Sequence, residues 1–312
     1  MGLSSSAISA RSVSIGETER AEIPPTACEL TAAQAWFLAD RLGAVSFPWV
    51  LAITQPYSEP SDRAGFEAEQ VATLTRMAVL SADGAVNPAV AQWIRTVCRP
   101  RRWLELRWVS GSGAMLRGLL ARRGDATVAA LRSEDLVTCS ELAIGYPEAM
   151  VPVLTAGLSG RAAARFAEFT VPAHIGARAD ERLRRGETLD EVMEYLGIPP
   201  AAHAVVRAAF APGRSYVEIV AGDHRDGHRI STDIGVSIVD TAAGRVLVTP
   251  LKAADGIWIS TFTPGTDLAI ATAVQRLTAA LPDGPWFPTA NLTRDFETST
   301  AERKEHVPEH VW

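Results

Sequence analysis

The residues best placed for chemistry are His224 and His228, which flank an Asp-Gly turn in the sequence DHRDGH. Asp223 and Asp226 add carboxylates, and imidazole and carboxylate groups are common metal ligands. A metal site needs three or four ligands that converge, together with neighbours that orient them. All four side chains belong to one short segment, so a solvated hairpin turn is the preferred interpretation. A metal-binding protein or an enzyme that uses the 223–228 loop is kept as the alternative.

A second glycine-rich stretch, GSGAMLRG (111–118), has an imperfect match to phosphate-binding loops. Leu116 occupies the place of the third glycine of a dinucleotide fingerprint, and no lysine follows Gly118 as a P-loop requires. The stretch is therefore typical of a hairpin tip. The chain also lacks the G-x-S-x-G motif of a nucleophile elbow. We predict no catalytic residue, no bound metal and no cofactor, and hence a protein that is not an enzyme.

Composition narrows the class of protein further. A net charge of -6 argues against a nucleic-acid surface, which needs an excess of Lys and Arg. No apolar run approaches the roughly 20 residues of a membrane span. Three widely spaced cysteines, Cys28, Cys98 and Cys139, indicate neither a disulfide framework nor a zinc site. These features predict a cytoplasmic protein without nucleic-acid binding or membrane insertion.

The elements that must carry any site fall into two halves. The first half begins with a helix capped by Thr31, a buried strand over 47–57, and helices over 62–80 and from Pro88. The hydrophobic period then changes from 3.6 to 2, which predicts four strands linked by short Gly and Asp turns. Their ranges are 103–110, 114–122, 126–132 and 136–142. A helix over 147–158 closes this half.

The second half has the same order. An irregular connection over 159–177 leads to helices over 178–196 and 200–210, and strands then return. Their predicted ranges are 215–221, 228–239, 245–250 and 257–262. A final helix runs from Gly265 to Leu281, and the chain from Pro282 onward is expected to be loosely held.

An internal repeat supports this division. Gly124, Val128, Leu131, Arg132 and Asp135 match Gly244, Val248, Leu251, Lys252 and Asp255 at a constant offset of 120 residues. We predict an α+β fold with a central antiparallel sheet from two pseudo-twofold-related halves, flanked by N- and C-terminal helical bundles. One domain would span 29–295, with pseudo-repeats at about 30–158 and 178–281. A disordered arm over 1–28 and a flexible charged tail over 296–312 would flank it.

Exposed surface on such a sheet is a candidate docking site. Trp108 and Trp258 lie on predicted strands and are candidates to face a partner, because Trp is enriched at interface hot spots.

Several segments, in their order and spacing, resemble the EspG family of type VII (ESX) secretion-associated chaperones of actinobacteria. They are LTAAQAWFLADRLGA (30–44), FPWVLAITQPY (47–57), WIRTVCRPRRWLELRWVSG (93–111), VEIVAGDHRDGHR (217–229), ADGIWISTFTPGTD (254–267) and LPDGPWFP (281–288). The similarity runs from about Leu30 to about Asp295. The short GSG link and the 217–229 segment look most like the branch that serves the third ESX system.

The resemblance implies a binding function. EspG proteins recognise the apolar helical tip of the PPE subunit in cognate PE–PPE heterodimers, keep these soluble in the cytosol and accompany them to the secretion ATPase complex. An apolar tip left uncovered would self-associate. A homodimer of the unliganded chaperone is compatible with this family, and so is the separate hypothesis of a structural, self-assembling protein with an open sheet edge.

The family's docking surface uses the sheet, the loop between its second and third strands and the C-terminal helical bundle. The resemblance maps that loop onto Ser110, Gly111, Ser112, Gly113 and Ala114. On the sheet we select Arg229, Ser231 and Asp233, which would alternate onto one face of their strand. The loop is shorter than in some relatives of the family. No tyrosine is followed four residues later by Asp or Glu, so the chain resembles an escort and not an ESX cargo.

Overall fold

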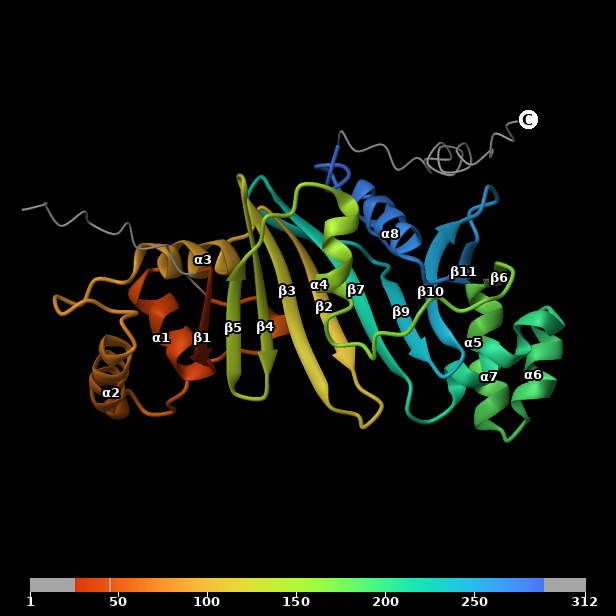
Figure 1. Cartoon of the computed structure of the whole chain (residues 1–312), viewed down its shortest axis with the longest axis horizontal. Coiled ribbons are helices and arrows are strands. Elements are labelled where there is room, and N and C mark those ends of the chain that lie inside the picture. Colours follow the sequence, from red (N-terminus) through yellow and green to blue (C-terminus); the bar gives the residue numbers. More distant parts are fainter. Residues whose placement is uncertain (1–25, 45, 289–312) are drawn as a thin grey trace, which may run out of the picture.

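A computed structural model of the chain describes residues 26–44 and 46–288. Its central feature is an 11-stranded sheet in which all neighbouring strands are antiparallel (Figure 1). The strand order is β1-β5-β4-β3-β2-β7-β9-β10-β11-β6, and β8 pairs with β7 outside this path. The predicted residues 1–25 of the arm and the predicted tail 296–312 lie outside the described residues.

Each half runs from an edge strand through a group of helices and then a group of strands to a closing helix. The first half contains β1 (Ala27–Thr31), α1 (Ala32–Arg41), η1 (Trp49–Leu51), η2 (Pro60–Asp62), α2 (Arg63–Arg76), α3 (Pro88–Cys98), β2 (Arg102–Val109), β3 (Met115–Arg123), β4 (Ala126–Ser133), β5 (Leu136–Glu141), η3 (Pro147–Met150) and α4 (Val151–Leu154). The second half contains β6 (Phe169–Pro172), α5 (Ala173–Arg184), α6 (Leu189–Tyr195), η4 (Pro200–Ala202), α7 (His203–Phe210), β7 (Ser215–Arg225), β8 (His228–Ser231), β9 (Val236–Thr241), β10 (Gly244–Lys252), β11 (Trp258–Pro264) and α8 (Asp267–Ala279).

The halves join where β2 pairs with β7. These are the first long strands of each half, and they run antiparallel with Leu106 opposite Ile219. An antiparallel pair is the arrangement that a twofold axis between two like strands produces. The predicted fold class, an α+β protein whose halves form one antiparallel sheet between helical bundles, is confirmed.

Helices cover the two sheet faces unevenly. Trp103, Leu119 and Ala130 pack beneath α1 and α3 at one end of the first face. At the other end of the same face, Val246 packs with Val205 of α7, while α4 and α8 cover the centre of the opposite face. The N-terminal and C-terminal helices therefore lie at the two ends of the sheet (Figure 1). Within the described residues, the α-helices that pack on the centre of the sheet, α4 and α8, lie on the opposite face. We call the centre of the first face, over β2 and β7 together with the adjoining residues Arg117 of β3 and Arg132 of β4, the open face.

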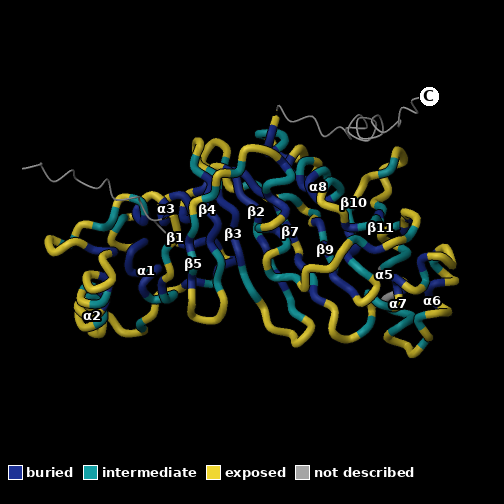
Figure 2. Tube along the Cα trace, viewed as in Figure 1, coloured by how far each residue is buried: buried dark blue, intermediate teal, exposed yellow. Residues whose placement is uncertain are grey.

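Burial follows from this arrangement. Figure 2 shows the buried residues along the strands and the exposed ones at the hairpin turns and on α2. Trp108, which the sequence offered as a partner-facing residue, is 1% exposed, and its indole Nε1 donates to the carbonyl of Leu154 at 2.8 Å. A Cβ added at Gly118 or at Gly157 would come within 2.7 Å of its ring. These two glycines make room for the indole, so Trp108 is a core residue and that prediction is wrong.

The predicted strand over 47–57 is also wrong. The segment contains the 3-10 turn η1, which follows Pro48 and ends at Ala52 with φ 50°. Val50, Leu51 and Ile53 are buried in the core on the first face of the sheet. The segment is therefore apolar because it packs on the sheet, although it is not one of its strands.

Three further predictions are wrong, two in the second half and one at the start of the first half. The connection over 159–177 contains the edge strand β6 and the start of α5, and the helix over 178–196 is divided between α5 and α6 at Gly186. In the arm, β1 begins at Ala27 and pairs with β5. The two edge strands were missed because they are short and are defined by pairing with distant strands.

Residues 283–288, the described part of the segment expected to be loosely held, are packed against the sheet. Trp286 is 1% exposed, and Arg102 and Arg122 donate to carbonyls of Gly284, Pro285 and Trp286. Over the described residues, no helix combines the length and the apolar character that crossing a membrane demands.

Candidate partner-binding surface

The open face carries charged side chains in a line across the sheet. The strand register sets Arg132, Arg117, Arg107 and Glu218 opposite one another on β4, β3, β2 and β7. Directly opposed residues of neighbouring antiparallel strands point to the same face. The line continues through Ser237 of β9 toward the C-terminal helices. The open face is therefore charged at its centre and becomes apolar near those helices, where Val248 and Phe262 continue the row.

Two of the three sheet residues selected from the sequence lie on this face. Arg229 is opposite His224, and its guanidinium lies 4.5 Å from the Trp103 ring and 3.8 Å from a carboxylate oxygen of Glu105. Ser231 is opposite Gly222 two residues further along β8, and it is exposed.

Asp233 does not share that strand. The predicted single strand over 228–239 is interrupted at 232–235, and Asp233 lies in this interruption between β8 and β9. The Thr232 backbone N–H still donates to the carbonyl of Ala221, and its hydroxyl accepts from the Ala221 amide and donates to the carbonyl of Ile234, so the chain turns away from the β7 ladder after this residue. The assumed alternation of Arg229, Ser231 and Asp233 on one strand is therefore wrong.

The candidate loop Ser110–Ala114 forms the predicted hairpin tip between β2 and β3. The Ser110 hydroxyl accepts from the Ala114 amide at 3.1 Å, and Gly113 has φ 84°. A Cβ at Gly111 would come 2.6 Å from the carbonyl oxygen of Gly213, so the loop abuts the turn that enters β7.

The structure separates the loop from β8. β8 pairs with the far end of β7, opposite Arg102, whereas the loop follows Val109 at the other end of β2. Seven residue steps of about 3.3 Å put roughly 23 Å between these ends. The predicted residues therefore mark two ends of one surface and not one compact site.

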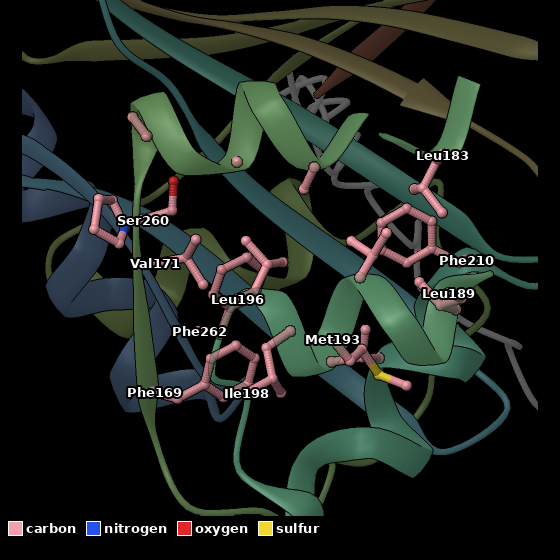
Figure 3. Close-up of a pocket in the computed structure, with 16 residues that line it drawn as sticks. Phe169, Val171, Leu183, Leu189, Met193, Leu196, Ile198, Phe210, Ser260 and Phe262 are labelled. Atoms are coloured by element: carbon pink, nitrogen blue, oxygen red, sulfur yellow. The ribbon is translucent and has the colours of Figure 1, made fainter. Parts of the chain in front are cut away.

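An apolar cavity of about 420 Å³ lies among the C-terminal helices, a volume within the range of ordinary ligand pockets. Figure 3 shows aromatic and aliphatic side chains around it, among them Phe169, Met193, Phe210 and Phe262. Phe169 and Phe262 stack at 4.8 Å on the sheet side, and Phe210 is 52% exposed. The cavity therefore offers an apolar recess with an aromatic residue accessible from solvent.

The sequence of α5 leaves this space open. Ala173, Gly176 and Ala179 line the cavity from successive turns, where larger side chains would fill it. α6 and α7 form the opposite wall and are joined by an ion pair of 2.9 Å between Arg207 and Asp190. The hydrogen bond from Arg207 lowers the pKa of Asp190, which keeps this exposed carboxylate ionised. Sequence reasoning missed these lining residues, although small residues at helical spacing were the available signal.

The histidine-rich loop does not converge into a metal site. His224 is opposite Arg229 and His228 is opposite Arg225, so the two imidazoles lie on opposite faces of the hairpin. Asp223 is buried and accepts from the amide of Asp283. Within 26–44 and 46–288, no group of three or more His, Cys, Asp or Glu side chains is arranged to hold a metal ion.

Comparisons with known proteins agree with the fold. The family model of the EspG family matches residues 31–276. The ESX-3 secretion-associated protein EspG3 of Mycolicibacterium smegmatis is 60% identical over 91% of this chain and 97% of its own length. EspG3 of Mycobacterium tuberculosis is 54% identical over 89% and 99%, and the ESX-1 secretion-associated protein EspG1 of the same species is 31% identical over 80% and 85%. These identities confirm the predicted resemblance to the third-system branch.

A solved structure has the same fold. The Mycobacterium tuberculosis type VII secretion chaperone EspG5, in complex with a PE25–PPE41 dimer, superimposes with a TM-score of 0.70 at 20% identity, covering 84% of this chain and 99% of EspG5. With the family match over most of its length and relatives at 54% and 60% identity, this chain belongs to the EspG family, whose members are secretion-associated proteins and not enzymes.

Proposed function

We propose that the protein is a cytosolic chaperone and adaptor of type VII secretion, which binds the apolar helical tip of the PPE subunit of a cognate PE–PPE heterodimer. It keeps the heterodimer soluble and delivers it for export. The observation that carries this proposal is the apolar cavity at the end of the open face, in a fold shared with a chaperone solved together with PE25–PPE41.

The chemistry of the cavity suits an apolar helix tip. Its lining is almost wholly aliphatic and aromatic, with the Ser260 side chain as the only hydroxyl among the lining residues. Burying an apolar side chain in such a recess is favourable by about 1.5–3 kcal/mol. The same burial removes from water the surface through which free PE–PPE tips would self-associate. Aggregation is thereby suppressed without any chemical step.

The chaperone would also take part in two other assemblies, the secretion ATPase complex and a homodimer of its own unliganded chains. Delivery requires release at the secretion ATPase complex. An unliganded homodimer would cover the same apolar surface, so self-association and partner binding compete. A dimer that persists unchanged when a PE–PPE pair is added would favour the hypothesis of a structural, self-assembling protein.

The test fills the cavity from Gly176. A Cβ at this position has no atom within 4 Å, so a larger side chain enters empty space from α5 without a clash at its root. We expect Gly176→Leu to abolish co-purification with PE–PPE pairs from the same genome, measured by co-expression, pull-down and size-exclusion chromatography.

Gly176→Ala is the matched control. It adds helix propensity of about 1 kcal/mol but leaves the cavity open, so the 1:1:1 complex should persist. A folded wild-type protein that binds no pair would rule out the proposed function. A Gly176→Leu variant that still binds would remove the cavity from it.

A further inference from the structure

The row of arginines on the open face lacks enough acidic partners. Arg107, Arg117 and Arg132 are opposed on three neighbouring strands, an arrangement of like charges that destabilises a sheet. Among the residues that the structure describes, Arg117 forms no ion pair with a carboxylate. Arg132 is engaged by backbone carbonyls of η1, so Arg107 and Arg117 are the cationic groups of the row that remain available to a partner.

The nearby glutamates neutralise only part of this charge. Glu105 is shared between Arg107 at 3.6 Å and Arg229 at 3.8 Å, and both distances exceed those of a well-formed ion pair. Glu218 stands opposite Arg107 across the β2–β7 junction. Four arginines and two glutamates of this group lie together on the face, namely Arg107, Arg117, Arg132 and Arg229 with Glu105 and Glu218. They leave an excess of two positive charges, on a chain whose net charge is -6. The open face is therefore a cationic area on an acidic protein.

An exposed tryptophan adjoins the row. Arg132 donates to the carbonyls of Leu51 and Ala52 and so fixes η1 against the sheet. Trp49 opens this turn, packed beside β2 and β3, and it is 88% exposed. Trp and Arg are the residue types most enriched among interface hot spots. A fixed backbone turn that presents an indole to solvent has the character of a binding contact and not of a core.

We infer that Arg107 and Arg117, with Trp49 beside them, form a second subsite that binds carboxylates on a helix of the partner whose apolar tip occupies the cavity. This inference rests on the proposed function and assigns the partner its charge pattern. Charge complementarity points to acidic side chains, and the planar guanidinium groups match carboxylates in a bidentate manner. The subsite is continuous with the cavity through one row of the sheet.

The row of residues from Arg107 to Phe262 sets the distance between the arginine subsite and the cavity. Arg107 is followed across the sheet by Glu218, Ser237, Val248 and Phe262, and Phe262 lines the cavity. Four strand spacings of about 4.8 Å separate Arg107 from Phe262 by roughly 19 Å. A helix laid along the row rises about 1.5 Å per residue, so its acidic residues should stand about 13 positions from its apolar tip.

The test uses charge reversal on the full chain. Arg107→Glu with Arg117→Glu should weaken binding of the PE–PPE pair at least about tenfold and flatten its dependence on salt concentration. Reversal at Arg117 places a carboxylate between Arg107 and Arg132, so the melting temperature of the single variant should stay unchanged or rise. Trp49→Ala should likewise lower affinity without lowering the melting temperature, because its side chain contributes little to the core.

Arg123→Glu is the matched control, since Arg123 is an exposed arginine at the far end of β3. It should leave affinity within about twofold of wild type. Lysine substitutions at the partner's acidic positions should restore binding to the doubly reversed variant. Wild-type affinity and salt dependence in that variant would overturn the second subsite while the proposed function stands. Failure of the wild-type protein to bind any pair would remove both.

Discussion

Trp108 and Trp49 show how one side chain's surroundings decide its role. Trp108 sits on a strand, where it could have faced a partner, but Gly118 and Gly157 open a slot for its ring and Leu154 accepts its N–H. Trp49 lies in an apolar segment that predicts burial, yet its indole is 88% exposed. Neither outcome is encoded in the residue type. Both follow from which atoms the fold brings against the ring.

Cys98 and Cys139 are buried free thiols. Burial raises the pKa of Cys98 and of Cys139 to about 12, from an ordinary value of 9.0. At pH 8 only about one molecule in ten thousand carries either thiolate, so these two thiols should resist DTNB in the folded protein and react after unfolding in denaturant. Rapid labelling of all three cysteines in the native protein would contradict this burial.

The raised pKa values of Cys98 and Cys139 also make the free energy of unfolding depend on pH. The folded state favours the protonated thiols, so their contribution is present below pH 9 and is lost as pH rises toward 12. We expect the free energy of unfolding to decrease over that interval. A Cys98→Ser variant, whose hydroxyl does not titrate there, should show a weaker decrease in denaturant titrations at successive pH values.

Among the elements, the helices begin where local chemistry dictates. Thr31 caps α1 and Thr188 caps α6, each in a reciprocal capping box with the residue three positions later. Such caps satisfy backbone N–H groups that have no partner inside the helix. A threonine also stands where β8 ends, since the Thr232 hydroxyl accepts from the Ala221 amide and donates to the carbonyl of Ile234 at the start of the 232–235 interruption.

The cap of α1 can be tested directly. Thr31→Ala removes the acceptor of the Gln34 amide, and we expect it to lower the free energy of unfolding by about 1 kcal/mol. Thr31→Ser keeps the hydroxyl and should cost clearly less. Chemical denaturation followed by circular dichroism distinguishes the two variants, and equal losses would show that the cap does not stabilise the helix.

Across the whole molecule, the two halves depend on each other. The core beneath α4 and α8 contains Leu106 from the first half and Ile219 and Ile270 from the second. β2 and β7 would each be an unpaired edge without the other. The sheet therefore joins the two halves, with the open face between their helical ends, and we expect them to unfold as one cooperative unit.

Leu106→Ala tests that cooperativity. Leu106 is fully buried at the junction, so its truncation should lower the free energy of unfolding by about 2–5 kcal/mol. Tryptophan fluorescence and far-ultraviolet circular dichroism should report one shared transition at the lower midpoint. Two separated transitions would show that the halves unfold independently.

Much of this architecture was accessible from residue patterns. The four strands after Pro100, the hairpin turns between them and the constant offset between Gly124 and Gly244 predicted the paired halves, because strand period and turn chemistry are local properties. The motif resemblance predicted the family. The candidate loop was placed correctly as a hairpin tip, and Arg229 and Ser231 lie on one face as expected.

The sequence by itself determined most of the helices, the four strands of the first half and the family, since these depend on neighbours along the chain. The tertiary structure alone decided that β1 and β6 pair at the sheet edges, that Asp233 leaves the strand, and that a cavity opens beside α5. It also decided that Arg107 and Arg117 stand side by side. Those features arise from contacts between residues far apart in the chain, which no local pattern of spacing specifies.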